Sequence, residues 1–237
     1  MTNQNKAAVA LGVLVTIAVV AMLLVVQSRG GDQPAPVATG SPEESMLVRE
    51  DSRILGEEGS SGVAVVEFLD FECEACAAAY PAVEQLRQEY AGEVTFVARY
   101  FPLPGHFNAE RAARAVESAA RQGELEAMYQ WMYETQAEWG EAQVPHDDLF
   151  RGFAEEIGLD MQQYDADYAS DEVAARVQRD VDDGLELGVQ GTPTFYVDGE
   201  PLCVPPAQAQ QALGAHLRHT DAALMSRSSH LYAMVSS

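Results

Sequence analysis

Basic residues are scarce in this chain, and lysine is almost absent. Of 237 residues, 14 are Lys or Arg and 37 are Asp or Glu, so the formal net charge at pH 7 is −23. Lys6 is the one lysine. A surface this acidic repels phosphate groups, which argues against nucleic acid and anionic lipid as partners. We interpret the acidity first as a feature that keeps the protein soluble.

Cysteine is also scarce, with Cys73, Cys76 and Cys203 as the only three. A structural zinc site would need a second pair of ligands, and no His-x3–5-His pattern accompanies Cys203. A c-type haem site would need histidine directly after the second cysteine, where Ala77 stands. We therefore expect no metal and no organic cofactor. Two inert buried cysteines are the remaining structural alternative, which the local pattern described next disfavours.

Cys73 and Cys76 stand where an expected strand meets an expected helix. The apolar run Val63–Val66 predicts a buried strand, and apolar residues recur at helical spacing over 77–90. Cys73 would then face free N–H groups and the positive end of the helix dipole, which favour a thiolate. Cys76 follows one turn later, within reach of a disulfide. The pattern predicts a reversible dithiol/disulfide switch.

The N-terminal segment contains an uncharged run from Ala7 to Val26. As a helix it would be about 30 Å long, enough to cross a bilayer. A cleaved signal peptide is the alternative, but its apolar region is usually shorter, about 7–15 residues. We therefore predict one transmembrane anchor within residues 1–29 and a flexible tether over 30–45, where Gly, Pro, Ser and Asp dominate.

Beyond the tether, the chain shows strand, helix and turn signals in a clear order. Residues 46–48 are expected as a short edge strand and 49–62 as a loop. Val94–Tyr100 predicts a second strand, parallel to the first in a right-handed βαβ unit. Helices are expected over 108–121, 124–139, 147–158, 160–168 and 170–187, then a hairpin of 194–197 with 201–204 around Asp198-Gly199, a closing helix over 206–217 and a tail over 220–237.

Three stretches together resemble the DsbA-like thiol-disulfide oxidoreductases. They are Val65–Cys76 with its Cys-Glu-Ala-Cys, Arg99–Leu103 and Val189–Phe195 with its Gly-Thr-Pro-Thr. The resemblance covers about residues 46–219 and is strongest with the membrane-anchored members of that family. It implies an α/β, thioredoxin-like fold with a helical insertion at about 106–187, preceded by one N-terminal transmembrane helix.

The resemblance also implies roles for three residues outside the cysteine pair. Pro193 would follow a cis peptide bond and lie against the cysteines, leaving the backbone of Thr192 to pair with an extended substrate. An ordinary trans turn proline is the alternative. Glu67 would lie buried under the cysteines and exchange a proton with the second thiol. Its alternative is a strand glutamate facing solvent, which a central strand covered on both faces makes unfavourable.

Two features depart from the family pattern. Strongly oxidising DsbA proteins have a histidine between the cysteines, whereas this chain has Glu74-Ala75. A negative charge at Glu74 opposes the Cys73 thiolate and so weakens the expectation of strong oxidising power. Cys203 has no partner within the chain while Cys73 pairs with Cys76. We expect it to be a buried apolar residue, with intermolecular pairing as the alternative.

The functional expectation is a membrane-tethered oxidoreductase whose catalytic domain lies on the extracytoplasmic side. Through Cys73 and Cys76 it would introduce disulfides into secreted or envelope proteins that contain thiols, and a membrane partner would reoxidise it. One enzymatic alternative is a reductase or isomerase that works with the reduced pair. Another is a peptide-binding or chaperone module in which the disulfide is only structural.

Overall fold

The computed structural model describes residues 42–202 and 211–218. In chain order the elements are α2 (Pro42–Leu47), β1 (Arg53–Ile54), β2 (Ala64–Leu69), α3 (Glu74–Glu89), β3 (Thr95–Tyr100), α4 (Ala109–Ala120), α5 (Leu125–Glu134), α6 (Gln136–Trp139), α7 (Asp147–Ile157), α8 (Met161–Tyr168), α9 (Asp171–Glu186), β4 (Thr194–Val197) and β5 (Glu200–Pro201). Residues 211–218 are helical and overlap the predicted closing helix.

Several predictions concern residues outside those described. They are the transmembrane span and most of the tether, the role of Cys203 and the C-terminal tail. Within the described residues, no helix has both the length and the apolar character needed to cross a bilayer. The anchor therefore stays a prediction.

One five-stranded mixed sheet organises the described residues, in the order β1-β3-β2-β4-β5. β2 and β3 are parallel, with Glu67 beside Ala98, and α3 connects them as the predicted βαβ unit requires. β4 runs antiparallel to β2 and places Phe195 beside Glu67. The β4–β5 turn uses Asp198 and Gly199 with φ of 51° and 84°, the positive values that a tight hairpin turn requires.

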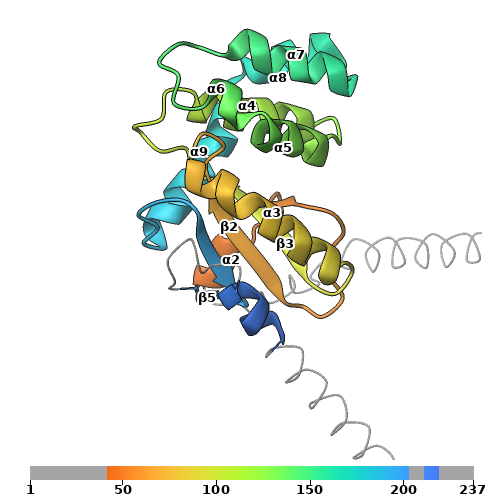
Figure 1. The fold of residues 1–237 in the computed structure, drawn as a ribbon, viewed down its shortest axis with the longest axis vertical. Coiled ribbons are helices and arrows are strands. Elements are labelled where there is room, and N and C mark those ends of the chain that lie inside the picture. The colour runs from red at the N-terminus through yellow and green to blue at the C-terminus, as the bar shows by residue number, and fades with distance from the viewer. Residues whose placement is uncertain (1–41, 203–210, 219–237) are drawn as a thin grey trace, which may run out of the picture. The chain divides into compact units, whose positions relative to one another are not determined.

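Alternation along β2 divides the core into two clusters. Val65 and Leu69 pack with α3 residues such as Val83 on one face, whereas Val66 and Phe68 pack with Leu47 and other residues on the opposite face. Glu67 belongs by alternation to the face of Val65 and Leu69, which is the face that α3 covers. Figure 1 shows α3 lying across β2 and β3, with α4 to α8 gathered at one end of the sheet.

The second face of the sheet is covered partly by α9. A Cβ atom at Gly184 of α9 would lie 2.7 Å from the ring of Phe101 and 3.0 Å from that of Phe68. Real side chains do not approach so closely, so glycine permits α9 to pack directly on these rings. The two rings meet edge to face with their centroids 6.1 Å apart.

The helices α4 to α9 occupy the stretch predicted as a helical insertion. Their core contains Trp139 and Phe150, both fully buried and packed edge to face at 4.9 Å. The side chain of Asn108, which precedes α4, makes no capping hydrogen bond; it donates to the carbonyls of Ala142 and Val144 and accepts from the N–H of His146. The residue thereby joins the start of α4 to the loop before α7.

Two local predictions were wrong. Residues 46–48 do not form an edge strand, because 46 and 47 end helix α2, which begins at Pro42 within the predicted tether. The edge strand is β1, Arg53–Ile54, which lies in the predicted loop and pairs antiparallel with β3. A strand of two residues is too short to show the alternation by which strands are predicted.

Buried ion pairs connect α2, β3 and α9. The guanidinium of Arg99 donates to Asp180 at 2.6 Å and to Asp183 at 2.5 Å, and it also contacts the carbonyls of Met46 and Leu47. The side chains of Arg99 and Asp180 are completely buried. Each charge is therefore satisfied by its partners, and the arrangement fixes α2 and α9 relative to the strand.

Candidate active site

Cys73 is the N-cap residue of α3 and lies in the turn that follows β2. Its N–H donates to the carbonyl of Asp70 at 3.2 Å, and its own carbonyl accepts from the N–H groups of Cys76 and Ala77 at 3.1 Å. Gln136 of α6 donates to the carbonyl of Cys73 as well, at 3.0 Å. Both Cys73 and Cys76 are buried free thiols. The cysteine pair therefore has the strand-to-helix placement that the sequence predicted.

The surroundings of Cys73 stabilise its thiolate. The neighbouring Cys76 thiol donates to its sulfur and lowers the pKa of Cys73 from 9.0 to about 6, against an opposing effect of burial. The Thr192 side chain and the backbone N–H groups of Cys76 and Ala75 also contribute to this lowered value. At neutral pH the reduced protein therefore has a thiolate at Cys73.

The surroundings of Cys76 and Glu67 favour their protonated forms, whereas those of Cys73 favour its ionised form. Burial raises the pKa of Cys76 well above 9.0, and the nearby charges of Glu67 and Cys73 add to that effect. Glu67 is 5% exposed, and burial, with Glu84 and Cys73 as further causes, raises its pKa to about 8. At pH 7 Cys76 is thus a thiol and Glu67 is mostly a neutral acid. The burial of Glu67 agrees with the prediction, whereas its role in proton exchange stays a prediction.

The Thr192–Pro193 peptide bond is cis, as the resemblance implied, and Thr192 contacts Cys73. The Cys73 thiol donates to the carbonyl of Thr192 across 3.4 Å. The Thr192 hydroxyl is buried and has no hydrogen-bond partner among the described residues. A thiolate at Cys73 cannot donate to the carbonyl, but it can accept from that hydroxyl.

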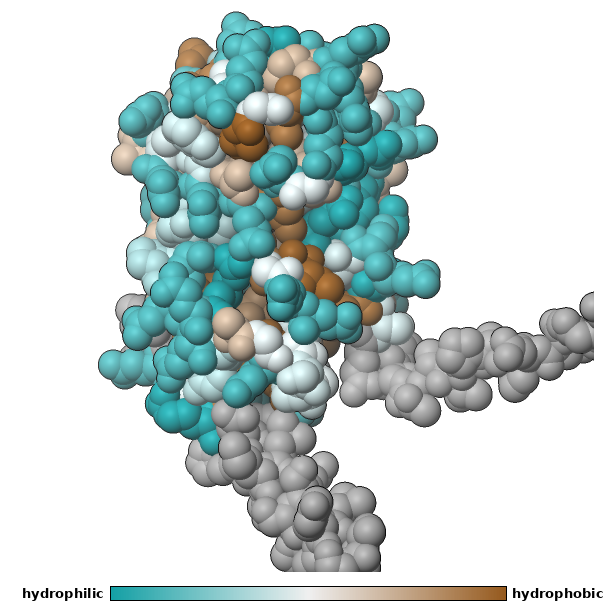
Figure 2. All heavy atoms as spheres, turned by 90° about the vertical axis from the view of Figure 1, so that its right-hand side faces the viewer, coloured by the Kyte–Doolittle hydropathy of each residue, from teal (hydrophilic) through white to brown (hydrophobic). Residues whose placement is uncertain are grey.

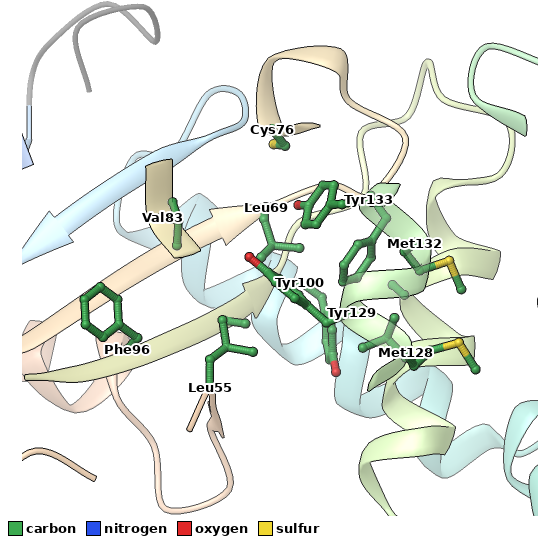
Figure 3. Close-up of a cluster of buried hydrophobic side chains, with 14 of the residues drawn as sticks. Leu55, Leu69, Cys76, Val83, Phe96, Tyr100, Met128, Tyr129, Met132 and Tyr133 are labelled. Atoms are coloured by element: carbon green, nitrogen blue, oxygen red, sulfur yellow. The ribbon is translucent and has the colours of Figure 1, made fainter. Parts of the chain in front are cut away.

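A tyrosine cluster from α3 and α5 lies beside the buried cysteine. Tyr133 stacks on Tyr80 at 5.1 Å, and Tyr129 meets Tyr133 edge to face at the same distance. Figure 3 shows Tyr129 and Tyr133 pointing from α5 toward the strands, while Met128 and Met132 point away from them. The cluster closes the site on the side of the helical insertion and contributes to the low polarity around Cys76.

Sequence reasoning missed two residues that lie close to the cysteine turn. Asp70, 1% exposed, accepts from the N–H groups of Glu72 and Leu103 and contacts Nδ1 of His106 at 2.5 Å. Asp70 belongs to the stretch Val65–Cys76 that carries the resemblance, but no sequence pattern connects it to His106. Gln136, which donates to the carbonyls of Phe71 and Cys73, had no sequence signal at all.

This geometry agrees with the comparison to known protein families. A family model described as thioredoxin matches residues 49–214. The chain belongs to the thioredoxin family. The match includes the cysteine turn, the cis-proline loop and the whole helical insertion, so the predicted thioredoxin-like α/β fold is confirmed.

Solved structures place this thioredoxin-family chain beside DsbA-type proteins. A thioredoxin-like oxidoreductase from Silicibacter pomeroyi is 28% identical, with a TM-score of 0.60, and covers 75% of this chain and 99% of its own. Wolbachia pipientis α-DsbA1 has a TM-score of 0.64 at 15% identity, covering 81% and 100%. Bacillus subtilis BdbD has a TM-score of 0.60 at 18% identity, covering 71% and 92%. These likenesses agree with the predicted resemblance to DsbA-like proteins and confirm the fold that it implied.

Two curated relatives are much longer than the matching segment. A Na⁺/H⁺ antiporter NhaA from Herminiimonas arsenicoxydans is 35% identical over 140 residues, and NhaA 3 from Salinispora tropica is 40% identical over 138 residues. These segments cover 59% and 58% of this chain but only 21% and 20% of the antiporters. The chain thus spans about a fifth of their length, and their ion transport concerns those whole proteins.

Proposed function

We propose that this protein introduces disulfides into extracytoplasmic proteins that contain pairs of thiols. The observation that supports this direction is the thiolate environment of Cys73, whose pKa lies near 6. A stabilised thiolate favours the reduced pair over the disulfide, so the oxidised protein tends to accept electrons. The geometry of the site suits thiol–disulfide exchange in either direction of electron transfer, because Cys73 lies at a helix N-terminus beside the Thr192 backbone.

The reaction starts from the Cys73–Cys76 disulfide. A substrate thiolate attacks the sulfur of Cys73, forms a mixed disulfide and displaces Cys76 as a thiolate. Because the pKa of Cys76 is raised, that thiolate takes up a proton, and Glu67, neutral at pH 7, is the donor. The second substrate thiolate then attacks the substrate sulfur and displaces Cys73, which leaves as a stabilised thiolate. The substrate loses two electrons and the cysteine pair gains them.

The remaining parts of the proposal come from the sequence. Residues 1–29 would anchor the protein to the cell membrane, with the catalytic domain on the extracytoplasmic side, where disulfides persist. A membrane partner would return the pair to the disulfide. The face in Figure 2 is mainly hydrophilic, with its apolar side chains in small groups, which suits a domain surrounded by water.

The test is an equilibrium titration of the Cys73–Cys76 pair in glutathione buffers, together with oxidation of a reduced peptide that has two cysteines. We expect a potential nearer to about −120 mV, as in DsbA, than to about −270 mV, as in thioredoxin. Rapid peptide oxidation by the disulfide form is expected too. A potential near that of thioredoxin, with reduction of protein disulfides, would instead support a reductase or isomerase.

A non-catalytic peptide-binding module is the remaining alternative. Cys73→Ser separates it from an enzyme, because a structural disulfide is not needed for binding itself. We expect the variant to lose all oxidation of the dithiol peptide. If peptide binding and function in cells survived this change, the pair would be structural.

A further inference from the structure

We propose that His106 stabilises the Cys73 thiolate electrostatically and so raises the oxidising strength of the pair. The inference rests on the proposed function and supplies a cation that the cysteine dipeptide lacks. His106 lies in the loop between β3 and α4, 33 positions from Cys73 in the sequence. Its side chain is 26% exposed, so it is partly shielded from water without being enclosed.

One residue, Asp70, connects His106 to the cysteine turn. The Asp70 carboxylate contacts Nδ1 of His106 at 2.5 Å, while the Asp70 backbone carbonyl accepts from the N–H of Cys73 at 3.2 Å. Asp70 is itself fixed, because its side chain also accepts from the N–H groups of Glu72 and Leu103 at 2.8 and 2.9 Å. The imidazole therefore has a defined position relative to Cys73, with Nδ1 as the donor to Asp70.

The charged groups around His106 come from three other segments. Asp70 and Glu72 lie in the turn after β2, Glu74 is at the start of α3, and Glu141 lies in the loop before α7. All four are carboxylates, which oppose a thiolate at Cys73 when ionised. A protonated His106 is the cation that offsets them, and its charge interacts with each of the four and with Cys73.

The protonation of His106 fits this role. Burial lowers its pKa, but the hydrogen bond and charge of Asp70 outweigh that effect, and the charges of Cys73 and Glu72 raise the pKa further, to a value above 6.5. The attraction between two opposite charges shifts the pKa values of both partners by the same amount in opposite directions. The Cys73 thiolate raises the pKa of His106, so protonated His106 lowers the pKa of Cys73 equally. Each group therefore favours the ionised form of the other in the reduced protein.

The decisive variant is His106→Asn. An asparagine amide keeps a donor near the position of Nδ1, so the contact with Asp70 survives while the positive charge is lost. We would measure the thiolate absorbance of the reduced protein against pH, and the equilibrium with glutathione at several pH values. We expect a higher pKa for Cys73 and about a threefold shift of the equilibrium toward the disulfide form at pH 6–7, the size of a partly screened charge pair.

Two comparison variants make the result specific. Glu74→Gln removes a negative charge beside Cys73 and should shift the thiolate pKa in the opposite direction. His146→Asn changes a histidine whose ring packs near Phe150 in the helical insertion, and it should change neither quantity. Thermal unfolding of each variant shows that it is folded.

If His106 acts through its charge, the shift in the glutathione equilibrium caused by His106→Asn should disappear at high pH, where His106 is neutral in the natural protein. An unchanged thiolate pKa in His106→Asn would overturn the inference. So would an equal shift at pH 6 and pH 9, because a merely structural effect through Asp70 does not depend on the imidazole charge. The thiolate titration uses the reduced protein alone, so it tests His106 even if the natural reaction proves to be reduction.

Discussion

The carbonyl oxygen of Thr192 lies 3.4 Å from the sulfur of Cys73, although 119 positions separate the two residues in the sequence. This contact exists only while Cys73 is a thiol, since a thiolate has no proton to donate. When the thiolate forms, the carbonyl becomes available for another donor, such as the backbone N–H of an extended substrate. The loop that we propose to bind the substrate thus also contacts Cys73, the proposed reactive group.

The Thr192 hydroxyl provides a first prediction. Thr192→Val keeps the shape of the side chain but removes the donor that favours the thiolate, so the pKa of Cys73 should rise above about 6. Ultraviolet absorbance of the thiolate against pH measures this directly. Thr192→Ser retains a hydroxyl and should restore the natural value; equal titrations for the valine variant and the natural protein would exclude the hydroxyl as a donor.

The two cysteines should differ in their ability to trap substrates. Cys76→Ser removes the resolving thiol but keeps the reactive one, so mixed disulfides through Cys73 should accumulate. Cys73→Ser should trap little, because Cys76 is 1% exposed and has a raised pKa. Each variant is incubated with a peptide whose two cysteines form a disulfide, so that a protein thiolate attacks that bond and a peptide thiolate leaves, and non-reducing gels show which variant retains the mixed disulfide. The reverse pattern would mean that Cys76 is the attacked sulfur.

Glu67→Gln should slow proton exchange with Cys76 while preserving shape. Since general acid–base groups typically contribute about 10²–10⁴-fold, we expect at least about a tenfold slower release of Cys76 near pH 7. Comparison of pH–rate profiles for the two proteins is the measurement. Profiles that superimpose between about pH 5 and 9, where such groups titrate, would rule out the role.

The same variant has a predicted effect on stability that depends on pH. The pKa of Glu67 is raised from 4.5 to about 8 on folding, so the folded state binds its proton more tightly than the unfolded state. The contribution of Glu67 to the free energy of unfolding is therefore fully present below about pH 4.5, and it is lost as the pH rises through about 8. Glu67→Gln should unfold at higher denaturant than the natural protein at pH 8, with a smaller difference at pH 5.

The buried ion pairs of Arg99 should contribute strongly to stability. Asp180→Ala leaves a completely buried guanidinium without one of its two carboxylates, which typically costs about 3–5 kcal/mol. Denaturant unfolding of the reduced protein measures the change. Glu172→Ala removes an exposed partner of Arg121, at 77% side-chain exposure, and should have little effect. Equal stability of the two variants would show that the Arg99 pairs are not needed for folding.

The membrane anchor is tested on the full chain. If residues 7–26 span the bilayer, the protein should stay with membranes after a carbonate wash, whereas a chain starting near Gly30 should be released. The shortened chain should retain its redox activity, because the cysteine site lies entirely in later residues. Recovery of a cleaved, soluble protein outside the cell would support a signal peptide instead.

The parts of the fold that were predictable from sequence have long, regular patterns. The strand before Cys73, the βαβ unit and the helices of the insertion were recognised because their apolar residues recur over many positions. β1 was missed because two residues, Arg53 and Ile54, cannot show a period, and their pairing with β3 is set by tertiary structure. The apolar residues 46–48 resemble a strand locally, but Arg99 binds the end of α2 through its carbonyls.

The residues of the candidate site also fall into two groups, those that could be predicted from the sequence and those that could not. Cys73 and Cys76 are separated by only two residues, and the resemblance, together with a central strand covered on both faces, indicated that Glu67 would be buried. His106 and Gln136 reach the cysteine turn only through the folded chain, from a loop and a helix of the insertion. Local periodicity contains no information about such contacts, so their part in the site required the structure.

The unequal acidity of the two thiols determines how the redox equilibrium depends on pH. Above about pH 6 the reduced pair keeps the proton of Cys76 but not that of Cys73, so two electrons arrive with one proton. When one proton accompanies two electrons, the reduction potential falls by about 30 mV per pH unit, and when two protons accompany them it falls by about 59 mV per pH unit. The potential should therefore fall steeply with pH in acid and about half as steeply near neutrality. An enzyme with this response retains most of its oxidising strength when its surroundings become moderately less acidic.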